Sequence, residues 1–362
     1  MNTQRARPQI RVLIVDDSAF MRNALTRMIA SDPDLWVAGT ARDGNDALRQ
    51  IPGLDPDVIT LDVEMPGWNG LETLRHIMAE YPRPVIMVSS VTVDNAETTF
   101  NALAAGAFDY VPKQLAAGSL DIVHLRDDLI AKVKAAAQSR VGSPFHSLSR
   151  KPPRPVEPIR RDDSFPVPEI VALGTSTGGP KALQEILPAL PPDLSVPIVI
   201  VQHMPVGFTG PFARRLDDLC AVSIREAAHQ DVIQPGVVYI APAGIQFTVE
   251  GTKSRAQISL SERPEHQLHV PSVDVMMQSV AEIFRSRAMG VIMTGMGADG
   301  AQGMKEIHGA GGFTIGQDEA SCAVYGMPRV CAEMGILNRV VPLAQIPTEI
   351  VQATKPRKAH VV

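Results

Sequence analysis

Aromatic residues, cysteines and long apolar runs are all scarce in this sequence. Phe, Trp and Tyr make up 4% of the 362 residues, and the apolar residues are mainly aliphatic, which suits buried parallel strands covered by helices. The three cysteines, Cys220, Cys322 and Cys331, lack C-x-x-C spacing, so they predict neither a disulfide framework nor a zinc site and indicate a reducing compartment. The apolar run Val12–Val15 stops at Asp16, too short for a signal peptide or a membrane span. We therefore expect a cytoplasmic protein with no membrane insertion.

An excess of positive charge is also missing. The formal net charge is -5 at pH 7, which argues against a nucleic-acid partner because phosphate binding usually needs a basic surface. At 362 residues the chain exceeds what one hydrophobic core usually organises, so two domains are expected.

A proline-rich stretch marks the boundary between these domains. Seven prolines lie between positions 142 and 168, interspersed with basic residues that we interpret as solvated linker charges. Proline removes backbone donors and favours extended conformations, so the stretch predicts a semi-rigid linker. The predicted organisation is a first domain over residues 8–140, a linker over 141–167 and a second domain over 168–355.

Short apolar runs alternate with helix-like stretches on both sides of this linker. Such alternation predicts two doubly wound α/β domains with mainly parallel sheets. The expected strands are Ile10–Val15, Val58–Leu61, Val85–Val88, Tyr110-Val111, Ile170–Leu173, Ile198–Val201, Val237–Ala241 and Val291–Thr294. The expected helices are Phe20–Ala30, Ala96–Ala105, Leu120–Gln138, Lys181–Leu187 and Val273–Phe284.

Acidic residues follow two of the expected strands in the first half. Asp16 and Asp17 come directly after the first strand, and Asp62 follows Val58–Leu61. Ligands of doubly wound sheets bind where the carboxyl ends of the strands meet, and three carboxylates there would repel each other without a hard cation such as Mg²⁺. Ser89 and Lys113 follow later strands and supply a hydroxyl and an ammonium suited to a phosphoryl group.

This constellation resembles the flavodoxin-like receiver domain of two-component response regulators, over roughly residues 10–138. The resemblance implies that Asp62 accepts the phosphoryl group and that Asp16 and Asp17 surround the Mg²⁺ with it. It further implies a metal-binding backbone carbonyl at Glu64, switch residues at Ser89 and Tyr110, and a phosphate-contacting Lys113. One departure is that Gln114, and not proline, follows Lys113.

The second half carries a candidate nucleophile. The run Gly174–Gly179 follows a strand, opens a helix and fits G-x-S-x-G, in which a sharp turn exposes the Ser176 hydroxyl. The alternative interpretation is a glycine-rich phosphate loop. His203 follows the next strand, and Asp299 lies in a glycine-rich loop after Val291–Thr294. Parallel strands bring such residues to one edge, so the three predict a Ser-His-Asp triad with His203 as general base.

The runs around these residues resemble the catalytic domain of the chemotaxis protein-glutamate methylesterases, over about residues 168–350. The resemblance implies that Ser176, His203 and Asp299 form the triad, flanked by Thr177 and Met296 with oxyanion-binding amides nearby. Thr175 stands where alanine is frequent in the family, and Ala298 where asparagine is frequent.

The two resemblances together imply a phosphorylation-activated enzyme of sensory adaptation. Its substrates would be glutamate methyl esters, and certain glutamines, on methyl-accepting chemotaxis receptors, and a chemotaxis histidine kinase would supply phosphate. The resemblance also implies that the receiver covers the hydrolase cleft until Asp62 is phosphorylated, and that the catalytic domain needs no cofactor.

Three alternatives remain at the level of the sequence. A DNA-binding output is disfavoured because the second half has no helix-turn-helix pattern or basic stripe. A scaffolding output and a general small-molecule esterase stay open. We interpret Ser272 and Asp274 first as helix-capping residues and second as groove-shaping ones, and His266 and His269 as exposed loop residues.

Overall fold

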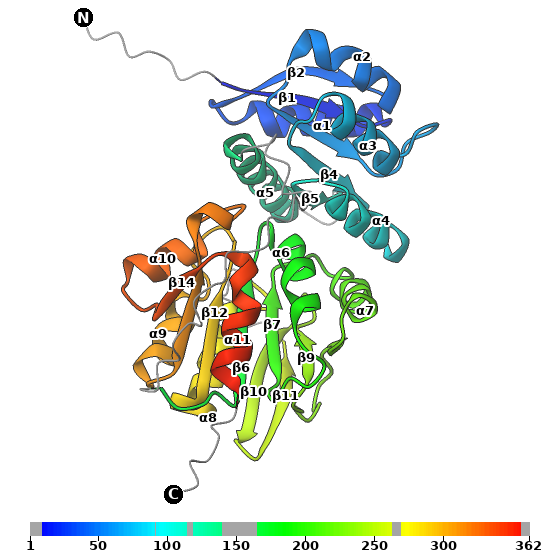
Figure 1. The fold of residues 1–362 in the computed structure, drawn as a ribbon. Coiled ribbons are helices and arrows are strands. Elements are labelled where there is room, and N and C mark those ends of the chain that lie inside the picture. Colours follow the sequence, from blue (N-terminus) through cyan, green and yellow to red (C-terminus); the bar gives the residue numbers. More distant parts are fainter. Residues whose placement is uncertain (1–8, 91, 114–118, 140–164, 263–268, 356–362) are drawn as a thin grey trace, which may run out of the picture. The chain divides into compact units, whose positions relative to one another are not determined.

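The chain forms two compact units. The computed structural model describes residues 9–90, 92–113, 119–139, 165–262 and 269–355. Its contacts separate Met1–Arg154 from Pro155–Val362 (Figure 1). Most of the predicted linker lies outside the described residues. Its last part is described, and there Phe165 packs on Phe313 with ring centroids 5.2 Å apart.

The first unit is a five-stranded parallel sheet in the order β2-β1-β3-β4-β5, with helices on both faces. Its strands are β1 (Ile10–Val15), β2 (Leu35–Ala41), β3 (Val58–Asp62), β4 (Val85–Ser89) and β5 (Asp109–Pro112). Its helices are α1 (Ala19–Ala30), α2 (Gly44–Leu54), α3 (Gly70–Glu80), α4 (Val93–Ala104) and α5 (Ser119–Gln138). On one face Val12 and Ile14 pack in a core with Leu25 of α1 and Leu129 of α5.

The second unit is a seven-stranded parallel sheet in the order β14-β13-β12-β6-β7-β9-β8, with a separate antiparallel pair, β10 and β11. The strands are β6 (Ile170–Thr175), β7 (Ile198–Gln202), β8 (Ser223–Glu226), β9 (Val237–Ile240), β10 (Gln246–Thr252), β11 (Arg255–Ser261), β12 (Ala288–Ile292), β13 (Phe313–Gln317) and β14 (Arg339–Val341). The helices are α6 (Gly179–Ile186), α7 (Thr209–Leu219), α8 (Val273–Phe284), α9 (Ala301–Gly309), α10 (Met327–Glu333) and α11 (Ile346–Thr354).

The prediction of two α/β units with parallel sheets is confirmed. The predicted strand Val291–Thr294 is wrong in its bounds, because β12 begins at Ala288 and ends at Ile292. Beyond its end, the Thr294 amide donates to the Gln317 side chain at 2.8 Å instead of to a neighbouring strand. The prediction also missed β2, an edge strand whose residues are mostly only partly buried.

The order of the central strands decides where the second unit can hold a site. β6 pairs with β12 on one side and with β7 on the other, all in parallel. The segments that follow these three strands therefore leave the sheet at one edge, at the point where the strand order reverses direction. Among the described helices, none has the length and apolar character needed to cross a membrane.

Candidate functional site

Ser176 occupies a tight turn between β6 and α6. The strand ends at Thr175, and Gly178, the N-cap of α6, has φ 76°, a left-handed conformation that favours glycine. The Ser176 amide donates to the Thr294 carbonyl at 3.0 Å, and its carbonyl accepts from the Gly179 amide at 2.8 Å. The turn is thus held both by its own helix and by the loop after β12.

Thr294 holds this turn through several hydrogen bonds, and only its place near a strand end could have indicated this role. Its hydroxyl donates to the Thr177 carbonyl at 3.0 Å and accepts from the Val324 amide at 3.0 Å. Its carbonyl accepts from the Thr175 hydroxyl at 2.8 Å. Thr175, which stands where the family often has alanine, therefore adds a side-chain bond to the loop after β12.

Gly295 brings this loop into close contact with the nucleophile. A Cβ at Gly295 would lie 2.9 Å from the Ser176 Cβ and 2.2 Å from the Met327 Sδ, so only glycine fits without displacing a neighbour. Met296 follows Gly295 and is half-buried, while Thr177 follows Ser176 and is buried. The two predicted flanking residues thus lie on the two loops that meet at Ser176.

His203 lies between Ser176 and Asp299. Its Nδ1 is 3.2 Å from the Ser176 Oγ, and its Nε2 is 2.8 Å from the Asp299 Oδ2. The buried Gln202 side chain donates to the carbonyls of Ser176 and His203 at 3.0 and 2.8 Å. With Nε2–H donated to the carboxylate, neutral His203 presents an unprotonated Nδ1 to the serine hydroxyl.

Asp299 receives four hydrogen bonds. Besides His203, its donors are the Ser272 hydroxyl at 2.8 Å, the Val273 amide at 2.8 Å and the Asp274 amide at 3.0 Å. Burial raises the pKa of Asp299, but the His203 contact and the amides of the first turn of α8 outweigh it and hold the pKa below its usual value. The carboxylate is therefore charged and fully hydrogen-bonded.

The capping role predicted for the start of α8 is confirmed. Ser272 is the N-cap, and its hydroxyl accepts from the Val275 amide at 3.4 Å. Asp274 caps a different helix, α9. Its carboxylate accepts a hydrogen bond from the Gly303 amide, in the first turn of α9, at 2.8 Å. The additional bond from Ser272 to Asp299 could not be read from the sequence. Of the two loop histidines, His266 lies outside the described residues.

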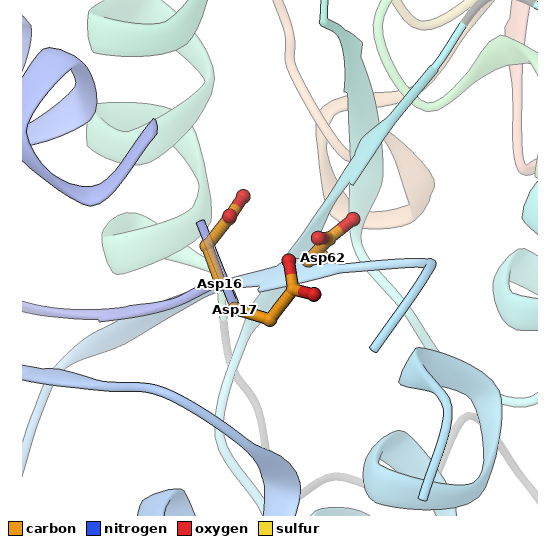
Figure 2. A group of neighbouring side chains, drawn as sticks. All are labelled: Asp16, Asp17 and Asp62. Atoms are coloured by element: carbon orange, nitrogen blue, oxygen red, sulfur yellow. The ribbon is translucent and has the colours of Figure 1, made fainter. Parts of the chain in front are cut away.

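The acidic residues of the first unit also come together. Asp16, Asp17 and Asp62 each place one carboxylate oxygen within 4.8 Å of the others, and Figure 2 shows the three side chains lying next to one another. The Lys113 Nζ lies 2.9 Å from the Asp16 Oδ2 and 2.6 Å from the Asp62 Oδ2. This oxygen-only donor set fits a hard divalent cation, and the ammonium offsets part of the negative charge.

Burial strongly affects the charges in this pocket. Burial raises the pKa of Asp62 to about 6, with repulsion from Asp16 adding to the effect and Lys113 opposing it. Burial lowers the pKa of Lys113, but its contacts with Asp62 and Asp16 outweigh burial and leave the pKa above its ordinary value. Lys113 is therefore charged between the two carboxylates.

The remaining predicted residues of the first unit lie at the end of β4, in β5 and in the loop after β3. The buried Ser89 hydroxyl lies 2.9 Å from the Thr99 hydroxyl of α4. Tyr110 is buried, with its ring edge-on to Phe100 at 6.4 Å between centroids. The Glu64 amide donates to the Asp62 carboxylate at 3.1 Å, so the backbone at Glu64 runs beside the acidic group.

Comparison with known proteins assigns a family to each unit. Residues 12–123 match the response regulator receiver domain, and residues 171–350 match the CheB methylesterase domain. The second match makes the DNA-binding alternative wrong, because this region belongs to an enzyme family.

Relatives extend this similarity over nearly the whole chain. The protein-glutamate methylesterase/protein-glutamine glutaminase 1 of Oleidesulfovibrio alaskensis is 45% identical over 95% of this chain and 99% of its own. The protein-glutamate methylesterase/protein-glutamine glutaminase of Symbiobacterium thermophilum is 46% identical, over 97% of this chain and 99% of its own. The crystal structure of the Thermotoga maritima CheB methylesterase catalytic domain matches with a TM-score of 0.50 and 37% identity, covering 51% of this chain and 98% of its own. The chain therefore belongs to the protein-glutamate methylesterase/protein-glutamine glutaminase family.

Proposed function

We propose that this chain hydrolyses glutamate γ-methyl esters, and deamidates certain glutamines, on methyl-accepting chemotaxis receptors in the cytoplasm. The proposal is carried by one observation: His203 lies between the Ser176 hydroxyl and the Asp299 carboxylate, within hydrogen-bond distance of both. Such an arrangement is the working geometry of serine hydrolases on unrelated folds. The names of the relatives supply the substrate class.

The reaction begins at the serine hydroxyl. The Ser176 Oγ attacks the ester carbonyl while Nδ1 of His203 takes its proton. The tetrahedral intermediate collapses to an acyl-enzyme as the protonated His203 returns that proton to the departing methanol. A water molecule, activated by the same nitrogen, then attacks the acyl group and releases the glutamate carboxylate and free Ser176. With a glutamine substrate, ammonia leaves in place of methanol.

Asp299 and the backbone stabilise the charges that develop. The Asp299 carboxylate accepts a hydrogen bond from the Nε2–H of His203 and stabilises the imidazolium form, since three further donors hold the carboxylate in its charged form. We assign the oxyanion site to amides near Thr177 and Met296, on the two loops that meet at Ser176. Amides fixed in this way stabilise the negative oxygen of the intermediate without reorganising.

Methanol release from a methylated receptor tests the proposed chemistry. We expect Ser176→Ala to lower the rate by at least about 10⁴-fold, because the nucleophile is lost while the fold is kept. Ser254→Ala, in the exposed turn between β10 and β11, is the matched control and should keep full activity. Release that continues in Ser176→Ala would contradict the triad.

The first unit is proposed to control this activity by phosphorylation. Asp62 accepts the phosphoryl group from a chemotaxis histidine kinase. Asp16, Asp17, Asp62 and the Glu64 carbonyl would hold Mg²⁺, which when bound offsets the charge of the phosphoryl oxygens. Lys113 contacts the phosphoryl group, and Ser89 and Tyr110 respond to it as switch residues.

Phosphorylation is proposed to relieve a restraint of the receiver on the esterase. The proposed domain organisation is a receiver over residues 8–140, a linker over 141–167 and a catalytic domain over 168–355. We expect a small phosphodonor with Mg²⁺ to raise methanol release from the intact chain. Asp62→Ala should keep the basal rate and lose the response. Stimulation that persists in Asp62→Ala would contradict the assignment of the phosphorylation site.

The broader alternative is an esterase of small molecules. It keeps the same triad and changes only the substrate. Comparing kcat/KM for a methylated receptor with that for small methyl esters separates the two, and a preference for the small esters would overturn the receptor assignment.

A further inference from the structure

A second histidine lies against the candidate general base. The ring of His269 stacks on the ring of His203, with centroids 4.3 Å apart and planes inclined by 13°. His203 follows β7, whereas His269 precedes α8, so two distant parts of the chain bring the rings together. The proposed chemistry gives His269 no part in proton transfer.

The segment that carries His269 is anchored on both sides. The buried Gln246 side chain, at the start of β10, donates to the His269 carbonyl at 3.1 Å and accepts from the Ser272 amide at 3.0 Å. The Gly244 amide donates to the Val270 carbonyl at 3.1 Å. The stacked ring and the Ser272 hydroxyl that holds Asp299 thus belong to one fixed segment.

The stack restrains a motion that the hydrogen bonds of His203 leave free. Its two nitrogens are held by the Ser176 Oγ at 3.2 Å and by the Asp299 Oδ2 at 2.8 Å. A ring held at both nitrogens can still tilt about the line that joins them, which turns the Nδ1 lone pair away from the hydroxyl. A second ring parallel to the first opposes this tilt, because tilting forces their atoms together.

The surroundings of His269 also favour the neutral form of its ring. His269 is exposed, but partial desolvation lowers its pKa, and the nearby His203 lowers it further. His269 is therefore kept neutral beside a ring that becomes positive during the reaction. The negative charge of Asp299 acts in the opposite direction and raises the pKa of His269.

We propose that His269 is a positioning residue, whose planar ring holds the imidazole of His203 with Nδ1 aimed at the Ser176 hydroxyl. Its contribution comes from the flat face of the ring and not from its nitrogens. The inference rests on the proposed esterase function, since it concerns the orientation of the same general base. A planar side chain without nitrogen should therefore replace it.

The test uses the full-length chain with His269→Ala and His269→Phe. We expect His269→Ala to lower kcat about 10-fold with little change in KM, because small misplacement of a reacting group is costly. His269→Phe should recover most of kcat, since its ring can stack in the same way. The matched control is His76→Ala, which removes a similar stacked ring, on Trp68 at 4.2 Å, from the first unit and should leave kcat unchanged.

A second readout separates this inference from the proposed substrate. The rate at which a fluorophosphonate labels Ser176 depends on the orientation of His203 and not on which ester the enzyme prefers. Labelling should slow about 10-fold in His269→Ala and recover in His269→Phe, even if methylated receptors prove not to be substrates. Thermal unfolding of each variant shows whether the fold is kept.

Two results would overturn the proposal. Equal labelling rates in the native chain and His269→Ala would show that the stack does not orient His203. Equally slow labelling in His269→Phe and His269→Ala, with both variants folded, would assign the effect to the nitrogens of His269 instead of to its ring face.

Discussion

The Ser272 hydroxyl, which caps α8, donates to the Oδ1 of Asp299 across 2.8 Å. The carboxylate proposed to support His203 is therefore held by the first turn of a helix, where backbone amides and the helix dipole both favour negative charge. One short segment, from His269 to Asp274, contacts both the imidazole and its carboxylate.

This contact predicts the effect of removing the cap. Ser272→Ala should cost about 1 kcal/mol of stability as a lost N-cap, and it should also lower kcat because Asp299 loses one donor. Ser272→Thr keeps the hydroxyl and should retain most of the stability and most of kcat. Asp43→Ala removes the N-cap of α2 in the first unit and is the control for stability alone. An unchanged kcat in Ser272→Ala would show that the remaining three donors suffice.

The charge of Asp299 predicts a dependence of stability on acid. Its pKa in the folded protein lies below that of an unfolded Asp, about 3.9. The resulting stabilisation is complete above that value and is lost as the pH falls toward the folded pKa. The stability difference between the native chain and Asp299→Asn should therefore shrink as the pH falls below about 4.

Calorimetry of the full-length chain measures this stability difference from the unfolding transition of the second unit. Both tryptophans, Trp36 and Trp68, lie in the first unit, so their fluorescence follows that unit separately and serves as an internal control. A difference that stays constant down to pH 3 would contradict a lowered pKa at Asp299.

The contact between Gly295 and Ser176 predicts a catalytic defect from one added methyl group. Gly295→Ala places a Cβ 2.9 Å from the Ser176 Cβ, so the turn must shift and kcat should fall by about 10²-fold. Gly309→Ala is the matched control, because a Cβ there meets no atom within 4 Å. It should leave kcat unchanged and alter stability by no more than about 1 kcal/mol. Similar kcat values in the two variants would contradict the tight contact.

Desolvation predicts that all three cysteines react slowly in the folded chain, although Cys331 is buried and Cys220 and Cys322 are partly exposed. It raises the pKa of Cys220 to about 11 and those of Cys322 and Cys331 to about 12. Nearby acidic residues add to the effect, and only the thiolate is nucleophilic. Alkylation by iodoacetamide at pH 8 should be at least about 100-fold slower in the native chain than in urea. Mass spectrometry of each peptide measures this, and rapid native labelling of any one cysteine would contradict its raised pKa.

The sequence by itself determined the architecture and the identity of most of the polar groups. Alternating apolar runs and helical stretches follow from local burial on both faces of a parallel sheet, so they predicted the two α/β units. Asp16, Asp62, Ser176 and His203 each lie at or just after a strand end, and parallel strands bring such ends to one edge. Their grouping could be inferred without knowledge of which strands are neighbours.

Only the tertiary structure decided how these groups are held. Thr294 fastens Thr175 from 119 positions away, and Ser272 reaches Asp299 from 27 positions away. These contacts depend on the order β12-β6-β7, which no local pattern contains. For the same reason, the sequence indicated only an ordinary loop residue at His269. Hydrophobic periodicity reports whether a residue is buried, whereas the partner of a hydrogen bond or a stacked ring is fixed by which distant segments the sheet order places side by side.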